Sequence, residues 1–328
     1  MRLNRFLMGA LLALPLWLAA GAASAQSNDA LFLEWLEGLR ADALANGISQ
    51  ETLDRSLVDV APIPRIIELD RRQPESTVTF ADYQTRIVNA TRIKIGRERL
   101  AKHRVLLDEI GGQFGVQPRF IVALWGIETN FGRFTGGFPV IDALATLAYD
   151  GRRSKYFRGE LLKALQIVEE GHIDPAEMKG SWAGAMGQAQ FMPSSFLNFA
   201  HDHNGDGAKD IWNTQGDVFA SAANYLKGVG WNDDITWGRK VSLPDGFDGA
   251  LVSLDVVKPI GDWQELGVRR ADGRDLPTRE IPASILRPGG EGGQAFIIYD
   301  NYRAILRWNR SHYFAMAVGQ LSDRIAGR

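Results

Sequence analysis

The sequence predicts a mainly α fold (α+β) in which a small β-rich segment is inserted among helices. Apolar residues recur at helical spacing in the first third of the chain. One such stripe, at i, i+3, i+4 and i+7, consists of Phe32, Trp35, Leu36 and Leu39. Helix-period segments continue through residues 116–232 between glycine-rich connections. From 237 to 298 short strand-like runs alternate with Gly, Pro and Asp, which is typical of a β-rich insertion.

Length and composition describe an ordinary globular protein. The chain has 328 residues, of which 45% are hydrophobic and 23% are charged. Such a chain can bury a sizeable core and suggests one large domain or two to three small ones. It contains no cysteine, which excludes a disulfide framework, a thiolate nucleophile and a lipid-modified cysteine.

The first residues have the layout of a cleavable secretory signal peptide, which we place at 1–25. Arg2 and Arg5 precede an apolar run from Phe6 to Ala20, and Ala23-Ser24-Ala25 stands before Gln26. The alternative is an uncleaved anchor, but no later stretch approaches the ~20 apolar residues of a membrane span. We therefore expect a periplasmic protein without a stable membrane anchor.

The charge balance argues against nucleic-acid binding. Removing Arg2 and Arg5 leaves 35 basic and 39 acidic residues, a formal net charge of −4. Nucleic-acid affinity depends on neutralising phosphates with basic side chains, and this balance gives no support for it.

A single carboxylate near an apolar helical stretch is the first candidate for chemistry. In "ALWGIETNFGRFTG", an apolar stripe is formed by Phe120, Leu124, Ile127 and Phe131. Glu128 falls roughly 70° from the centre of this stripe at ~100° per residue. Loss of hydration there would raise its pKa, as a general acid requires. The alternative is a glutamate that turns outward at the helix end.

Several long motifs in one order resemble the lytic murein transglycosylase B family. They are "GIETNFGRFTG", "DALATLAYDGRRSKYFRGEL", "MKGSWAGAMGQAQFMPSSF" and "NGDGAKDIWNTQGDVFASAANYLKGVGW". "LDRRQPE" upstream and "NYRAILRWNRSHYFAMAV" downstream resemble it too, so the likeness covers nearly all of the mature chain.

The resemblance implies a fold and its divisions. An N-terminal helical lobe at 26–115 would precede a lysozyme-like catalytic core at 116–236. The β-rich insertion at 237–298 and a C-terminal helix at 299–328 that returns to the core would follow.

The resemblance also implies an activity without a required cofactor. The partner would be peptidoglycan glycan strands, cleaved between N-acetylmuramic acid (MurNAc) and N-acetylglucosamine (GlcNAc). Glu128 would be the single acid/base: it protonates the leaving oxygen and then deprotonates the MurNAc 6-hydroxyl. The product would be a 1,6-anhydro sugar.

One observation on the residues agrees with this mechanism. A standard glycosidase uses two carboxylates, ~5 to 5.5 Å or ~6.5 to 9.5 Å apart. Near Glu128 the sequence offers Asp142 and Asp150, and Asp142 can equally be a helix cap. An enzyme that uses its substrate's own hydroxyl needs no second acid.

The family's substrate-binding positions match seven residues here. They are Arg152, Arg153, Ser181, Gln190, Tyr225, Trp308 and Asn309. The paired arginines would hold the lactyl carboxylate or the peptide, and Gln190 would bond the cleaved sugar. Trp308 and Phe314 stand where tyrosines are usual, which removes two hydroxyls. Surface charge and core packing are the competing interpretations of the arginines and the aromatics.

The segment "DHNGDG" resembles the first half of an EF-hand calcium loop. The possible ligands of a structural calcium ion are Asp202, Asn204, Asp206, the carbonyl of Ala208, and Asp217. The twelfth position is Asn213 rather than a bidentate glutamate, and Asp217 lies beyond it. A set of Asx turns without metal is the alternative.

Two other functions remain open from the sequence. A non-catalytic peptidoglycan-binding scaffold on the same fold is disfavoured by the presence of Glu128, Ser181 and Gln190. A hydrolytic muramidase would use the same residues and admit water. The residues leave open whether cleavage is exolytic or endolytic, and which proteins recruit the enzyme.

Overall fold

The computed structural model describes residues 19–72 and 78–327. Most of the predicted signal peptide at 1–25 lies outside the described residues. The first unit ends at Ile48 and contains helix α1 (Ala19–Ala45), which confirms the helix predicted there. No helix in the described ranges combines the length and apolarity needed to cross a bilayer.

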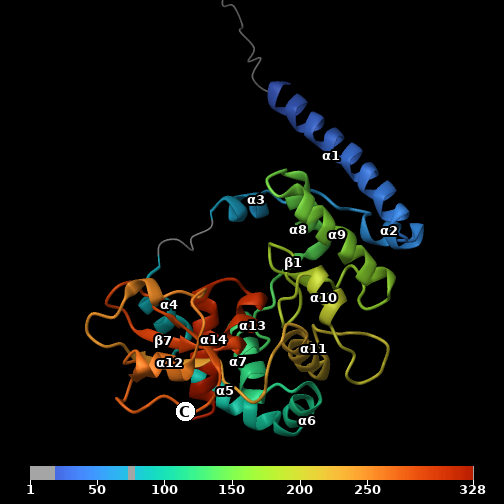
Figure 1. Cartoon of the computed structure of the whole chain (residues 1–328). Helices are drawn as coiled ribbons and strands as arrows, with labels where there is room; N and C mark the ends of the chain where they lie inside the picture. Colours follow the sequence, from blue (N-terminus) through green and yellow to red (C-terminus); the bar gives the residue numbers. More distant parts are fainter. Residues whose placement is uncertain (1–18, 73–77, 328) are drawn as a thin grey trace, which may run out of the picture. The chain divides into compact units, whose positions relative to one another are not determined.

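The second unit, residues 49–328, is mainly helical among its described residues. Its first helices are α2 (Gln50–Ser56), α3 (Pro64–Arg71), α4 (Phe80–Ile87), α5 (Ala90–Lys102) and α6 (Arg104–Phe114). The central helices are α7 (Pro118–Thr129), α8 (Val140–Tyr149), α9 (Ser154–Glu169), α10 (Pro193–Phe199) and α11 (Gln215–Gly228). The chain closes with α13 (Asp300–Trp308) and α14 (His312–Ile325). Figure 1 shows α7 running beside α14.

The helical pattern from about Phe80 to Phe114 predicts one long helical segment, but the structure has three helices there. Asn89 has an extended backbone, and its side chain accepts a hydrogen bond from the amide of Arg92, so it ends one helix and caps the next. His103 interrupts the run a second time. The apolar periodicity continues through both breaks, which is why the pattern alone did not reveal them.

Two antiparallel sheets complete the unit. Strands β1 (Phe138–Pro139) and β2 (Lys179–Gly180) pair beside the central helices. The larger sheet has the order β4-β6-β7-β3-β5. Its strands are β3 (Gly238–Ser242), β4 (Lys258–Pro259), β5 (Arg269–Arg270), β6 (Pro282–Leu286) and β7 (Ala295–Ile298), with α12 (Ile260–Glu265) between β4 and β5.

Strand β7 joins the sheet to the main core. Ala295 and Ile297 pack in the cluster of the insertion, whereas Phe296 and Ile298 pack in the main helical core. Successive side chains of a strand point to opposite faces, so both faces of β7 are buried. Strand β7 thus packs the larger sheet against the main helical core.

Candidate active site

Helix α7 lies inside the main core. Pro118 occupies its first position, where its missing N–H costs no hydrogen bond. Residues 119–126 are all buried, so the helix is enclosed on every side. The expectation of one apolar stripe with Glu128 on its shoulder was too narrow, because apolar residues occupy the remaining faces as well. Glu128 lies in the last turn and is partly buried.

The backbone turns sharply directly after Glu128. Asn130 and Phe131 have φ values of 51° and 63°, in the left-handed region. Among the described residues, the third non-glycine position with positive φ is Gln190. Such conformations are costly outside glycine and persist only where the surrounding structure fixes them. All three lie in the two segments that the family motifs assign to the site.

The carboxyl group of Glu128 has one defined hydrogen-bond partner. Trp308 Nε1 donates to Glu128 Oε1 across 2.7 Å, although the two residues lie 180 positions apart. Burial raises the pKa of Glu128 to about 7, and the bond from Trp308 opposes part of this rise. A large fraction of the group is therefore protonated near neutral pH, which suits a general acid.

Trp308 is held in place by other aromatic rings. Its ring centroid lies 5.2 Å from that of Phe191 and 4.7 Å from that of Tyr225. Tyr225 is buried, and its hydroxyl donates to the carbonyl of Arg307 across 2.7 Å. Tyr225 thus packs against the ring of Trp308 and supports it, while its hydroxyl is engaged in a hydrogen bond within the protein.

Gln190 and Ser181 hold the loops beside Glu128. Gln190 Nε2 donates to the carbonyls of Thr135 and Gly187 at 3.0 and 2.9 Å. This amide therefore links the loop after α7 to the "GAMGQAQF" turn. Ser181 Oγ accepts from the amide of Ala185 at 3.0 Å and closes the same segment.

Gln188 was not predicted, yet its side chain bonds both to α7 and to the segment that precedes α11. Its Oε1 accepts from Trp125 Nε1, and its Nε2 donates to the carbonyl of Trp212, each across 2.8 Å. Its own carbonyl accepts from Thr129 Oγ1, next to Glu128. Gln188 lies in the same motif as Gln190, but the sequence does not indicate which partners each of the two glutamines bonds.

Two glycines of this region allow close contact between backbone segments that are distant in the sequence. A Cβ on Gly136 would lie 2.0 Å from the carbonyl oxygen of Gly180. One on Gly187 would lie 2.6 Å from that of Ile211. The small residues are thus required to bring the loops together around Glu128.

The predicted arginine pair converges on a residue that the sequence analysis did not single out. Both arginines form ion pairs with Asp70, which is 2% exposed. Arg152 Nη2 lies 2.7 Å from Asp70 Oδ2, and the other oxygen accepts from Arg153. The arginine side chains themselves are 51% and 42% exposed, so each keeps solvent-facing N–H groups. The clue was the "LDRR" motif, which supplies Asp70.

The two nearby acids considered as partners of Glu128 are bound elsewhere. Asp142 accepts a hydrogen bond from the backbone of Ala61. Asp150 pairs with Arg71 at 2.9 Å. Both bonds attach the segment before and within α3 to α8. Among the described residues, no carboxylate contributes to the pKa shift of Glu128.

Of the two remaining positions matched to the family, Asn309 lies at the surface and Phe314 lies in the core. Asn309 is exposed just past the end of α13, and its Oδ1 accepts from the amide of Ser311 at 3.0 Å. Phe314 is buried in the main core. A hydroxyl at Phe314 would therefore face protein rather than solvent.

The first half of the possible calcium loop is organised by its own backbone amides. Asp202 accepts from the amides of Gly205 and Gly207 at 2.8 and 2.9 Å. Asp206 Oδ1 accepts from the amide of Ala208 at 2.9 Å, and Asn204 Nδ2 donates to Asp206 Oδ2. These contacts are those of successive Asx turns.

The expected closing ligand has another role. Asp217 is fully buried, and its two oxygens accept from the amides of His203 and Asp210 at 2.9 and 2.8 Å. Within the described ranges, no group of three or more His, Asp or Glu side chains is arranged to hold a metal ion. As arranged, Asp217 fits a loop-closing role better than a bidentate calcium ligand.

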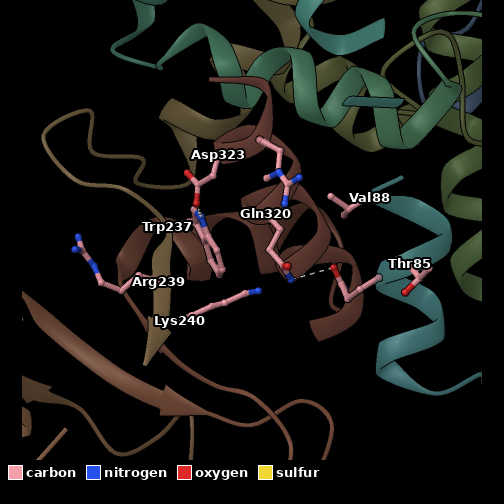
Figure 2. A pocket seen from close by; sticks show the side chains of 9 residues that line it. Thr85, Val88, Trp237, Arg239, Lys240, Gln320 and Asp323 are labelled. Atoms are coloured by element: carbon pink, nitrogen blue, oxygen red, sulfur yellow. Dashed lines mark hydrogen bonds between the residues drawn. The ribbon is translucent and has the colours of Figure 1, made fainter. Parts of the chain in front are cut away.

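A cavity of about 470 Å³ lies away from Glu128. Figure 2 shows its lining, where Trp237 Nε1 donates to Asp323 and Gln320 donates to Gln84. Asp323 also pairs with Arg119. The carboxylate of Asp323 is thus engaged by two donors, Trp237 and Arg119.

Residues 31–323 match the family model described as the Transglycosylase SLT domain. The chain belongs to this transglycosylase family. It is 31% identical over 303 residues to the membrane-bound lytic murein transglycosylase B of Escherichia coli K12, covering 86% of this chain and 79% of that protein.

Solved structures of two relatives share the fold of this transglycosylase. SltB3 from Pseudomonas aeruginosa, in complex with NAG-NAM-pentapeptide, has a TM-score of 0.89 and 43% identity, covering 90% of this chain and 80% of SltB3. Slt35 from E. coli in complex with calcium has a TM-score of 0.75 and 29% identity, covering 88% and 91%. The predicted mainly α, lysozyme-like fold and the family resemblance are both confirmed.

Proposed function

We propose that the chain is a lytic transglycosylase that cleaves the MurNAc-β-1,4-GlcNAc bond of peptidoglycan with Glu128 as its single acid/base. The observation that carries this is a partly buried carboxyl group with a pKa of about 7, which no second carboxylate of the described ranges influences. Family membership supports it, and SltB3 was also solved with NAG-anhNAM-pentapeptide.

The chemistry needs one proton that leaves and returns. Protonated Glu128 gives its proton to the glycosidic oxygen as the C1–O bond breaks. The resulting carboxylate takes the proton of the MurNAc 6-hydroxyl, whose oxygen bonds to C1. The products are a GlcNAc end and a 1,6-anhydro-MurNAc end, and Glu128 is protonated again without water being consumed.

Substrate contacts are proposed at the positions that match the family's binding residues. Arg152 and Arg153 have exposed N–H groups that suit the carboxylates of the lactyl-peptide moiety. The ring of Trp308, which bonds Glu128, and the exposed Asn309 that follows it in the chain would contact the sugar. Gln190 and Ser181 act mainly through the loops that they hold.

Location and domain organisation complete the proposal. Export to the periplasm rests on the charged and apolar layout of residues 1–25. We retain the lobe at 26–115, the core at 116–236, the insertion at 237–298 and the closing segment at 299–328. The strands β3 to β7 all fall within the proposed insertion.

Catalysis in this scheme uses no metal. For the loop 202–217 we propose weak structural calcium binding, supported by the presence of calcium in Slt35 and by the carboxylates of the partly exposed Asp202 and the exposed Asp206. Asp217 would have to release backbone amides to join the ion, which limits the affinity.

The experiment that tests the function is digestion of purified sacculi by wild type and by Glu128→Gln. Anhydro products from wild type alone support the proposal. Free reducing ends from wild type would indicate a muramidase. No products from either protein would indicate a binding scaffold.

A further inference from the structure

We propose that Trp308 is a positioning residue that keeps Oε1 of Glu128 as the acceptor oxygen and so places the acid proton on Oε2. The inference rests on the proposed role of Glu128 as the acid. An indole N–H can only donate a hydrogen bond. In a protonated carboxyl group the carbonyl oxygen is the better acceptor, and the 2.7 Å contact is made by Oε1.

The donor is fixed well enough to impose this choice. Trp308 is the last residue of α13, and its ring packs against Phe191 and Tyr225. Tyr225 cannot rotate its hydroxyl freely, because that group donates to the carbonyl of Arg307. The indole ring is thus held by these two aromatic contacts while its N–H donates to the carboxyl group.

The same arrangement serves both halves of the reaction. When Oε2 has given its proton to the glycosidic oxygen, Oε1 still accepts from the indole, and the charge is stabilised by that bond. Oε2 is then the oxygen that takes the proton of the 6-hydroxyl. One oxygen performs both transfers, and the carboxyl group need not rotate between them.

Charged neighbours do not compete with Trp308 for this role. The titratable groups on elements packed around α7 include Arg99 and Lys102 on α5, Glu109 on α6, Tyr225 on α11 and His312 on α14. The causes of the shifted pKa of Glu128 are burial and the indole bond, with no contribution from these groups.

The main test is the Trp308→Phe variant, which keeps a ring and removes the donor. We expect the pKa of Glu128 to rise by about one unit, because a bond that stabilises the charged form is lost. The falling alkaline limb of kcat/KM should move upward by the same amount, and kcat should drop roughly tenfold as the carboxyl group loses its orientation.

The matched control is Trp263→Phe. Trp263 Nε1 also donates to an acceptor, the carbonyl of Ala283, but it lies in the cluster of the insertion. Its loss should lower the melting temperature and leave the pH limb in place. Trp308→Tyr should keep the limb near that of wild type, since a hydroxyl can also donate. An unchanged limb in Trp308→Phe, or an equal shift in the tyrosine variant, overturns the inference.

A measurement on the unaltered Trp308 is independent of turnover and of how the Trp308 variants fold. With ¹⁵N-labelled indole, the Nε1–H resonance of Trp308 should titrate with the pKa of Glu128, and that titration should vanish in Glu128→Gln. No titrating indole resonance in wild type would contradict the inference, even if anhydro products are formed. Absence of anhydro products with an intact titration would instead count against the proposed function.

Discussion

Trp308 Nε1 and Glu128 Oε1 lie 2.7 Å apart and join the end of α13 to the end of α7. Both residues are close to the point where their helix stops. The backbone after Glu128 therefore leaves the helix axis at once, and the carboxyl group faces the closing segment of the chain. Burial of the carboxyl group and this hydrogen bond together set the pKa of Glu128, on which the expected pH dependence rests.

Activity should fall as pH rises through about 7. The acid works in its protonated form, and burial holds the pKa of Glu128 at about 7. On a soluble glycan oligomer, kcat/KM at pH 8 should be about tenfold below its value at pH 6. The limb is measured with initial rates in buffers of constant ionic strength. A flat profile from pH 6 to pH 9 would show that this carboxyl group is not the acid.

Glu128 should also make the stability depend on pH. Its pKa in the folded state, about 7, is above the ordinary 4.5, so the folded protein binds the proton more tightly than the unfolded chain. The free energy of unfolding should therefore decrease as pH rises from 4.5 to 7, by up to roughly 3 kcal/mol.

The Glu128→Gln variant isolates this effect. Its stability relative to wild type should increase between pH 5 and pH 8 in urea unfolding, because the amide has no charge to bury. A difference that stays constant over this range would mean that Glu128 titrates normally in the folded protein.

Asp70→Asn should weaken the binding of peptide-bearing glycans more than that of peptide-free glycans. The substitution removes the charge that holds Arg152 and Arg153, so both guanidinium groups lose their common anchor. We expect KM to rise about tenfold on the peptide-bearing substrate, with a smaller change on the other.

Asp150→Asn is the control for Asp70→Asn. Asp150 pairs with Arg71 in the same region but does not contact the arginine pair. Its KM values for the two substrates should change in parallel. Equal effects of Asp70→Asn on both substrates would show that the arginines do not read the peptide.

Calcium should raise the melting temperature by only about 1 to 3 °C at 1 mM. This follows from an affinity of ~10⁻⁴ to 10⁻³ M, as for extracellular calcium modules. Asp202→Ala combined with Asp206→Ala should remove the increase and keep the melting temperature measured in chelator nearly unchanged. Identical melting curves of wild type in chelator and in calcium would mean that the loop is a set of turns alone.

The helices and the short strands of 237–298 could be predicted because their patterns are local. Apolar residues between Phe32 and Leu39 recur at helical spacing. In 237–298 this spacing gives way to short strand-like runs. The breaks at Asn89 and His103 were missed since apolar periodicity continues through them. A capping asparagine is a weak signal until its backbone is seen.

The motif indicates Glu128 as the candidate acid, but the sequence could not predict its hydrogen-bond partner. Nothing in the sequence brings Trp308 next to a residue 180 positions away; only the packing of α13 and α14 near α7 does so. Asp70 was missed for the same reason, because its link to Arg152 spans 82 positions. Tyr225 was predicted by matching, and the structure adds that its hydroxyl is already bonded.

The most direct test of the central claim is the mass of the muropeptides released from sacculi by wild type in ¹⁸O-labelled water. Because the 6-hydroxyl of MurNAc attacks C1, the products should be lighter by one water than those of a hydrolytic muramidase and should carry no ¹⁸O. Glu128→Gln, with a melting curve like that of wild type, should release none of them. Products with labelled reducing ends, or anhydro products released by the glutamine variant at the wild-type rate, would contradict the account.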